Sequence, residues 1–85
     1  MLLMPWDIEG VKIEVSKHFA IKYLKSWGWD FNDLRDAIRE AYKIEKVGKE
    51  KYEVYTQKNG FKKIILVYIE ERIVCITGST GGKRQ

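Results

Sequence analysis

The chain has 85 residues, which excludes a multidomain protein, so we expect a single domain over 1–85. Hydrophobic residues make up 45% of it, which excludes an intrinsically disordered chain and allows a small core. Sixteen Lys and Arg against twelve Asp and Glu give a net charge of +4. Two explanations of this charge stay open: a nucleic-acid partner, or the Lys- and Glu-rich surface of a thermophile protein.

The chain starts with MLLMPWDIEG, an apolar patch without the basic start and long apolar run of a secretory signal. No stretch approaches the roughly 20 apolar residues that a membrane-spanning helix needs. We therefore expect a protein of the cytoplasm.

Residues 11–16 alternate apolar and polar side chains, which is the period of a half-buried strand. Residues 17–27 change to a helical period, and Gly28 is a typical helix terminator. The apolar side of this helix combines Phe19, Ala20, Tyr23, Leu24 and Trp27. The opposite side carries His18, Lys22 and Lys25. The pattern predicts an amphipathic helix with a basic outer side.

A second helix is predicted over residues 29–43, because Asp30 stands at the N-cap position and Asp33 follows in a capping-box position. The basic side chains of this helix are Arg35, Arg39 and Lys43. If the two helices lie side by side, their basic sides join into one anion-attracting surface. We predict that nucleic acid binds this surface.

The remaining residues predict strands. The segments are KIEKV, YEVYTQ, FKKIILVYIE and RIVCIT, in chain order. Asn59-Gly60 is a strong hairpin signal, and Glu70 with Glu71 turns the chain before the last strand. The predicted fold is therefore α+β: one strand, two helices and an antiparallel meander of three or four strands, with both helices on one sheet face.

Two predicted strands are apolar on both faces, at residues 64–69 and 73–76. An antiparallel strand with one face in water should alternate, so something should cover the second face of the sheet. Three covers stay open: the N-terminal segment 1–10, a second copy of the chain, or a partner protein.

The chain ends in ITGSTGGKRQ, whose glycines and lysine suggest a phosphate-binding loop. The glycine spacing differs from the Walker A pattern, and too few residues follow Lys83 to start the helix whose amino end would bind phosphate. We predict a flexible basic tail at 79–85 instead. Either this tail has no role, or Lys83 and Arg84 contact the phosphate backbone of a nucleic acid.

His18 is the only histidine and Cys75 the only cysteine. Two such isolated residues do not make a metal site, and no motif indicates a cofactor, so we predict neither. A cysteine within an apolar strand is predicted to be buried and inert. His18 has two interpretations: a chance residue on a solvated helix side, or a general base next to the phosphate-holding Lys22 and Lys25.

Two stretches, SKHFAIKYLKSWGWDFNDLRDAI and KYEVYTQKNGFKKIILVYIEERIVCIT, together resemble the RelE/ParE-like toxin superfamily. The first is similar to the His, the basic helix, the Gly-aromatic turn, the acidic cap and the second helix of a small branch of that superfamily. The second is similar to the hairpin and the final strands. The resemblance covers residues 11–78.

The resemblance implies an RNA-binding domain of a toxin–antitoxin pair, either an endoribonuclease or a degenerate relative, with an antitoxin-like peptide as partner. It implies a catalytic role for His18, to which we add Arg72 and Tyr68 from their place near the last hairpin. Ser26 and Trp27 stand where those domains place a basic residue, which leaves catalysis open. The alternative function is a non-catalytic protein-interaction module or a homodimer.

Overall fold

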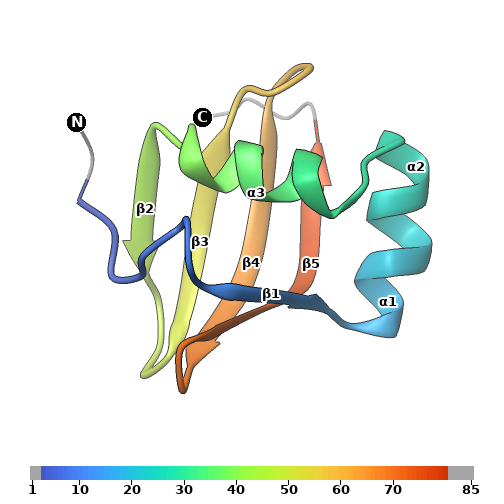
Figure 1. Ribbon diagram of the computed structural model, residues 1–85. Coiled ribbons are helices and arrows are strands. Elements are labelled where there is room, and N and C mark those ends of the chain that lie inside the picture. Colours follow the sequence, from blue (N-terminus) through green and yellow to red (C-terminus); the bar gives the residue numbers. More distant parts are fainter. Residues whose placement is uncertain (1–2, 81–85) are drawn as a thin grey trace.

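A computed structural model of the chain describes residues 3–80. Its strands are β1 (Lys12–Val15), β2 (Lys43–Lys46), β3 (Lys51–Thr56), β4 (Lys62–Ile69) and β5 (Arg72–Thr80). They form one five-stranded sheet in the order β1-β5-β4-β3-β2 (Figure 1). Strands β2 to β5 are an antiparallel meander, whereas β1 pairs with β5 in parallel. The α+β class is confirmed. The sheet is mixed, because β1 is added to the antiparallel meander as a parallel strand.

Residues 17–27 form one continuous helix, called the first helix below. It consists of α1 (Lys17–Phe19), the π-helical turn η1 (Ala20–Leu24) and α2 (Lys25–Trp27). Ser16 begins it, because its hydroxyl accepts from the Phe19 N–H at 3.0 Å. Gly28 ends it in the left-handed conformation, with φ of 71°. The wide π turn suits a sequence in which the two buried residues of the helix stand five positions apart, at Phe19 and Leu24.

The second helix, α3 (Phe31–Arg39), begins with the predicted capping box. The Asp30 carboxylate accepts from the Asp33 N–H at 2.8 Å, and the Asp33 carboxylate accepts from the Asp30 N–H at 3.0 Å. The prediction that this helix continues to residue 43 is wrong. The Tyr42 N–H donates to the Tyr55 carbonyl at 3.0 Å, and Lys43 is the first residue of β2. Pairing with β3 therefore outweighs the helical period of this segment.

The core lies between the helices and one face of the sheet. Its fully buried side chains are Phe19, Leu34, Ala37, Ile38, Val54, Thr56, Ile64, Leu66, Ile73 and Cys75. Trp6, 5% exposed, joins this core and meets Tyr52 and Tyr68 edge-on at 5.4 and 5.5 Å between ring centroids. Tyr52 and Tyr68 lie on the same sheet face as Val54 and Leu66, two residues away along each strand. The N-terminal segment therefore lies on the helix side of the sheet and does not cover the second face.

Both predicted turns are present. Asn59 and Gly60 have φ of 53° and 98° between β3 and β4, and Glu70 and Glu71 have φ of 52° and 62° between β4 and β5. Strand β5 continues to Thr80, so residues 79 and 80, expected in the tail, belong to the sheet. Residues 81–85, with the predicted contacts Lys83 and Arg84, lie outside the described residues. Among residues 3–80, none of the helices has the length and apolar character that crossing a membrane requires.

Candidate functional site

The three predicted catalytic residues do not lie at one place. Tyr68 packs on Trp6 on the helix side of the sheet. Arg72 lies on the opposite face, because its neighbour Ile73 is the strand partner of Tyr68 and is fully buried. Its guanidinium pairs there with Glu14 at 3.5 Å. His18 lies at the start of the first helix, beyond the other end of β1, so a substrate in contact with Tyr68 would face away from Arg72.

A hollow of about 250 Å³ lies beside Tyr68. It is lined by Asp7, Gly10, Val11, Tyr68 and Glu71. Its two ionisable acids repel a phosphate group, because like charges within a few ångströms oppose each other. The surroundings of Tyr68 therefore do not favour a scissile phosphate.

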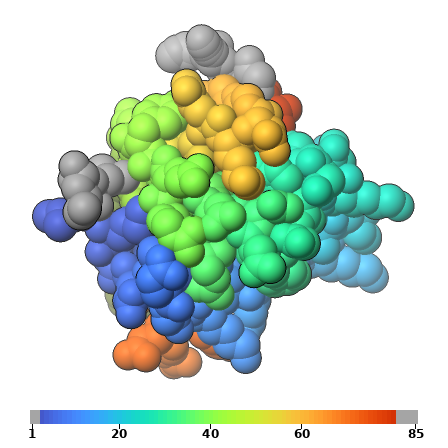
Figure 2. Space-filling model, turned by 45° about the horizontal axis from the view of Figure 1, so that its top comes forward, coloured from blue at the N-terminus to red at the C-terminus, as the bar shows by residue number. Residues whose placement is uncertain are grey.

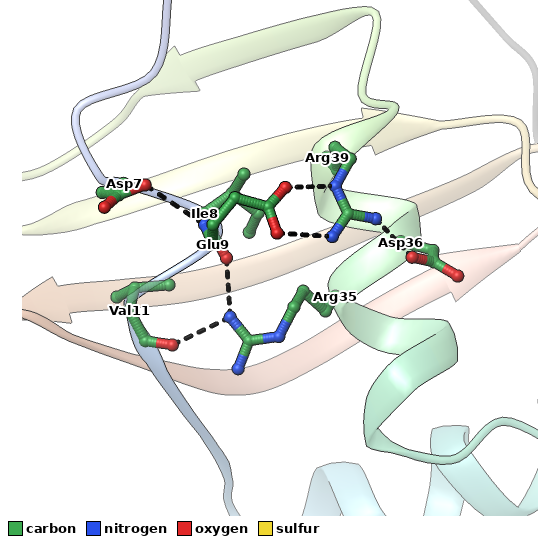
Figure 3. A network of polar contacts seen from close by, with 7 residues as sticks. All are labelled: Asp7, Ile8, Glu9, Val11, Arg35, Asp36 and Arg39. Atoms are coloured by element: carbon green, nitrogen blue, oxygen red, sulfur yellow. Dashed lines mark hydrogen bonds and ion pairs between the residues drawn. The ribbon is translucent and has the colours of Figure 1, made fainter.

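Arg35, a predicted nucleic-acid contact, is bound within the molecule. Its Nη1 donates to the carbonyl oxygens of Ile8 and Val11, at 2.6 and 2.9 Å (Figure 3). These contacts hold the N-terminal segment against α3, and the two segments lie directly against each other in Figure 2. Arg35 is half-buried, and its guanidinium supplies hydrogen bonds to two backbone oxygens of the N-terminal segment.

Arg39, one turn further along α3, is also engaged. Its Nε and Nη2 donate to the two carboxylate oxygens of Glu9 at 2.8 and 3.1 Å, and its Nη1 donates to Asp36 (Figure 3). The Arg39 hydrogen bonds and charge lower the pKa of the Glu9 carboxyl below its usual 4.5. Glu9 and Asp36 raise the pKa of Arg39 in return. Two carboxylates therefore neutralise this cation.

Lys43 lies apart from the other predicted contacts. It is in β2, with its ammonium 5.2 Å from the centre of the Tyr55 ring. Tyr55 is the strand partner of Lys63 and alternates with the buried Val54, so it points away from the helices. The predicted union of the two basic helix sides into one surface is therefore not present: Arg35 and Arg39 hold the N-terminal segment, and Lys43 is on the other face of the sheet.

The first helix differs from α3 in its charges. Its ionisable side chains other than tyrosine are Lys17, His18, Lys22 and Lys25, and it contains no Asp or Glu. All four are exposed. Within residues 3–80, none of these side chains has a carboxylate oxygen within 4.0 Å, since the ion pairs found there involve other cations. Ile21 stands among them with 61% of its surface exposed.

The buried side of the first helix orients this basic side. The rings of Phe19, Tyr23 and Trp27 follow each other along the helix, with centroids 5.4 to 5.8 Å apart. Thr77 of β5 donates to the Tyr23 hydroxyl at 3.4 Å, and the His18 ring meets Tyr23 edge-on at 5.7 Å. This packing directs Lys22 and Lys25 outward. The basic side of the first helix, Lys17, His18, Lys22 and Lys25, is the candidate site.

Lys62 is a buried cation that the sequence did not reveal. Its Nζ donates to the carbonyl oxygens of Asn59 and Lys58, at 2.6 and 3.2 Å. The rings of Trp27 and Trp29 lie 5.5 and 5.4 Å from it, within cation–π range. Burial lowers the pKa of this lysine. Lys62 ties the β3–β4 hairpin to the end of the first helix, and no pattern distinguishes it from the neighbouring lysines, Lys58 and Lys63, which are only half-buried.

The described residues outside the candidate site offer neither a reactive thiol nor a metal-binding cluster. Cys75 is fully buried, and burial raises the pKa of its thiol to about 12, so it is present as the unreactive thiol. Between residues 3 and 80, no three His, Cys, Asp or Glu side chains gather closely enough to bind a metal ion. Comparisons of the chain with models of protein families, with curated proteins and with solved structures find no match.

Proposed function

We propose that this protein is an RNA-binding domain of the RelE-like kind, and that it binds RNA through the basic side of the first helix. The observation that carries the proposal is a set of four exposed basic residues on a helix that has no acidic residue, with no carboxylate partner among residues 3–80. The order of strand, two helices and meander supports the resemblance to that superfamily.

The physical basis is the release of counterions from the nucleic acid. An ammonium group that is not already paired can neutralise a phosphate and release the cation condensed on it. Lys22 and Lys25 are available for this, whereas Arg39 would first have to leave Glu9 and Asp36. Ile21 adds an apolar contact beside the lysines for a base or a ribose.

We propose binding without cleavage. Cleavage of RNA needs a general base, a general acid and cations held together around one phosphate. His18 is the only one of the three predicted catalytic residues that lies on the first helix; Arg72 is bound to Glu14, and Tyr68 faces a hollow with two carboxyl groups.

The proposal is tested by measuring the affinity for a fluorescently labelled single-stranded RNA of mixed sequence. The variant Lys22→Glu/Lys25→Glu removes two phosphate contacts, which lowers affinity about 20-fold or more at 0.1 M salt. The matched control is Lys46→Glu/Lys49→Glu, which changes the net charge by the same amount. Lys46 and Lys49 are exposed and lie in and after β2, at the opposite edge of the sheet (Figure 1).

The control variant should stay within about twofold of the original affinity. An equal loss in both variants would mean that net charge alone attracts RNA, and an unchanged affinity in Lys22→Glu/Lys25→Glu would remove the first helix from the proposal. The same RNA, analysed by gel after long incubation, should remain intact. Cleavage that disappears in His18→Ala would instead support the endoribonuclease.

A further inference from the structure

The second face of the sheet, called the open face below, is apolar at its centre. Its central residues are Ile65, Val67 and Ile69 of β4, and Val74 of β5. A β-bulge in β5 places Thr77, rather than Ile76, opposite Ile65. The central residues alternate with the fully buried Ile64, Leu66, Ile73 and Cys75, so they point away from the core. The helices and the N-terminal segment lie on the other side of the sheet (Figure 1). Nothing among residues 3–80 covers the open face.

We propose that a second copy of this chain covers the open face, with a two-fold axis that crosses β4 between Ile65 and Val67, perpendicular to the strands. Each strand then lies over the same strand of the other copy, and residues on either side of the axis exchange places along that strand. Ile65 of one copy then lies over Val67 of the other, and Val67 over Ile65. On the neighbouring strand, Val74 and Thr77 are the partners of Val67 and Ile65, so Val74 of one copy lies over Thr77 of the other. Apolar side chains therefore meet apolar side chains along β4 at the centre.

The charges on β3 follow the same symmetry. Glu53 is the strand partner of Ile65, and Lys51 is the strand partner of Val67, so both lie on the open face. The axis that exchanges Ile65 with Val67 also brings Lys51 of one copy over Glu53 of the other, twice. Lys51 has no carboxylate within 4.0 Å in the described chain, so it is available for this pairing. The open face is therefore complementary to itself in the charges of β3 and at the centre of β4, whereas Lys63 of one copy lies over Ile69 of the other.

The size of the open face suits a dimer. Five strands about 4.8 Å apart and an eight-residue β4 give a footprint of about 20 by 27 Å, or roughly 500 Å² in projection. The accessible surface of the face is larger than this projected area, because its side chains project from the sheet. For comparison, a stable interface buries about 800 Å² on each partner. Two such faces pack about 10 Å apart, as in a β-sandwich.

A nucleic acid is a poorer occupant of this face. Phosphates gain nothing from the aliphatic side chains at the centre of this face. Its cations, Lys43, Lys51 and Lys63, are interspersed with Glu45 and Glu53, which are direct strand partners, so they form no continuous basic surface. An apolar peptide from another protein, such as the antitoxin-like partner that the resemblance implies, is the remaining rival. It would not require Lys51 and Glu53 to complement each other across two copies.

Charge reversal separates these occupants. The full chain, Lys51→Glu, Glu53→Lys, and an equimolar mixture of the two variants are compared by sedimentation equilibrium, with thermal unfolding to show that each is folded. The unaltered chain should be a dimer. Each variant alone opposes like charges across the interface and should dissociate about tenfold or more readily. In the mixture, two lysines of one variant face two glutamates of the other, so a heterodimer should form with affinity near that of the unaltered chain.

A monomeric chain at concentrations up to about 1 mM would overturn the proposal and leave a different protein as the cover. A dimer that both variants retain would also overturn it, since the interface would then lie elsewhere. A mixture that stays as dissociated as its components would exclude the two-fold pairing. Because the first helix lies on the other side of the sheet, none of these results depends on RNA binding.

Discussion

The two helices of this protein have similar basic side chains in the sequence but use them differently. On α3, Arg35 donates to two backbone carbonyls and Arg39 to two carboxylates, and both thereby fix the N-terminal segment. On the first helix, Lys22 and Lys25 are exposed, and no carboxylate of the described part of the chain pairs with them. The comparison teaches that a basic stripe is a binding surface only where the rest of the chain leaves it unpaired.

The difference has a structural cause. Residues 3–10 return over the sheet beside α3, where Trp6 packs into the core, and so bring carbonyl groups and Glu9 within reach of the two arginines. The first helix lies beside β5, at the other side of the molecule from β2 (Figure 1). Arginine, with its planar fork of donors, suits the side of α3 where several acceptors lie within reach. Lysine suits the exposed side of the first helix.

The largest expected effect in this comparison is on stability. Arg35→Met removes the donor from the carbonyls of Ile8 and Val11 and keeps much of the side-chain stem. We expect the free energy of unfolding to fall by about 2 kcal/mol, since hydrogen bonds from charged donors are worth roughly that amount. Urea denaturation followed by circular dichroism measures it.

The matched control for Arg35→Met is Lys25→Met, which makes the same kind of change on the first helix. An exposed, unpaired lysine should change stability by less than about 0.5 kcal/mol. If Lys25→Met proves as destabilising as Arg35→Met, the two helices do not differ in the way described.

A smaller effect concerns the ion pair between Glu9 and Arg39. Because Arg39 lowers the pKa of Glu9 in the folded protein, this carboxylate stabilises the fold at pH values above its unfolded pKa, near 4.5. That stabilisation is lost as the pH falls through the lower folded value. The stability difference between the unaltered chain and Glu9→Gln should therefore be present at pH 7 and shrink as the pH falls below 4.5 and through the lower folded pKa.

The control for Glu9→Gln is the same pH series on Lys22→Gln, a charge-removing change on the first helix. Its stability should follow that of the unaltered chain at every pH, because Lys22 pairs with no carboxylate of residues 3–80. A difference for Glu9→Gln that does not decrease as the pH falls below 4.5 would show that the carboxylate acts through something other than its charge.

Much of the fold was predictable because it follows from local signals. The capping box of Asp30 and Asp33, the helix end at Gly28 and the turn at Asn59-Gly60 depend on residues close in the sequence. The end of α3 was not predictable in this way, because pairing of residue 42 with β3 decides it. The parallel pairing of β1 with β5 joins residues some sixty positions apart, and no pattern signals it.

The candidate site was predictable only in part. The basic side of the first helix follows from helical spacing, and the structure keeps His18, Lys22 and Lys25 exposed there. Arg35 is engaged by carbonyl groups 24 and 27 residues away in the chain, and the sequence contains no signal for these hydrogen bonds. The second apolar sheet face was foreseen from residues 64–69, whereas the side on which the N-terminal segment lies was not.

The central claim, that the basic side of the first helix contacts phosphates, is tested most directly by the salt dependence of RNA affinity. For three lysines, Lys17, Lys22 and Lys25, the slope of log affinity against log salt should be about −2 with a single-stranded RNA. Lys22→Glu/Lys25→Glu should reduce its magnitude to about 0.7. A slope near zero for the unaltered chain, or a slope that this double variant leaves unchanged, would contradict the account.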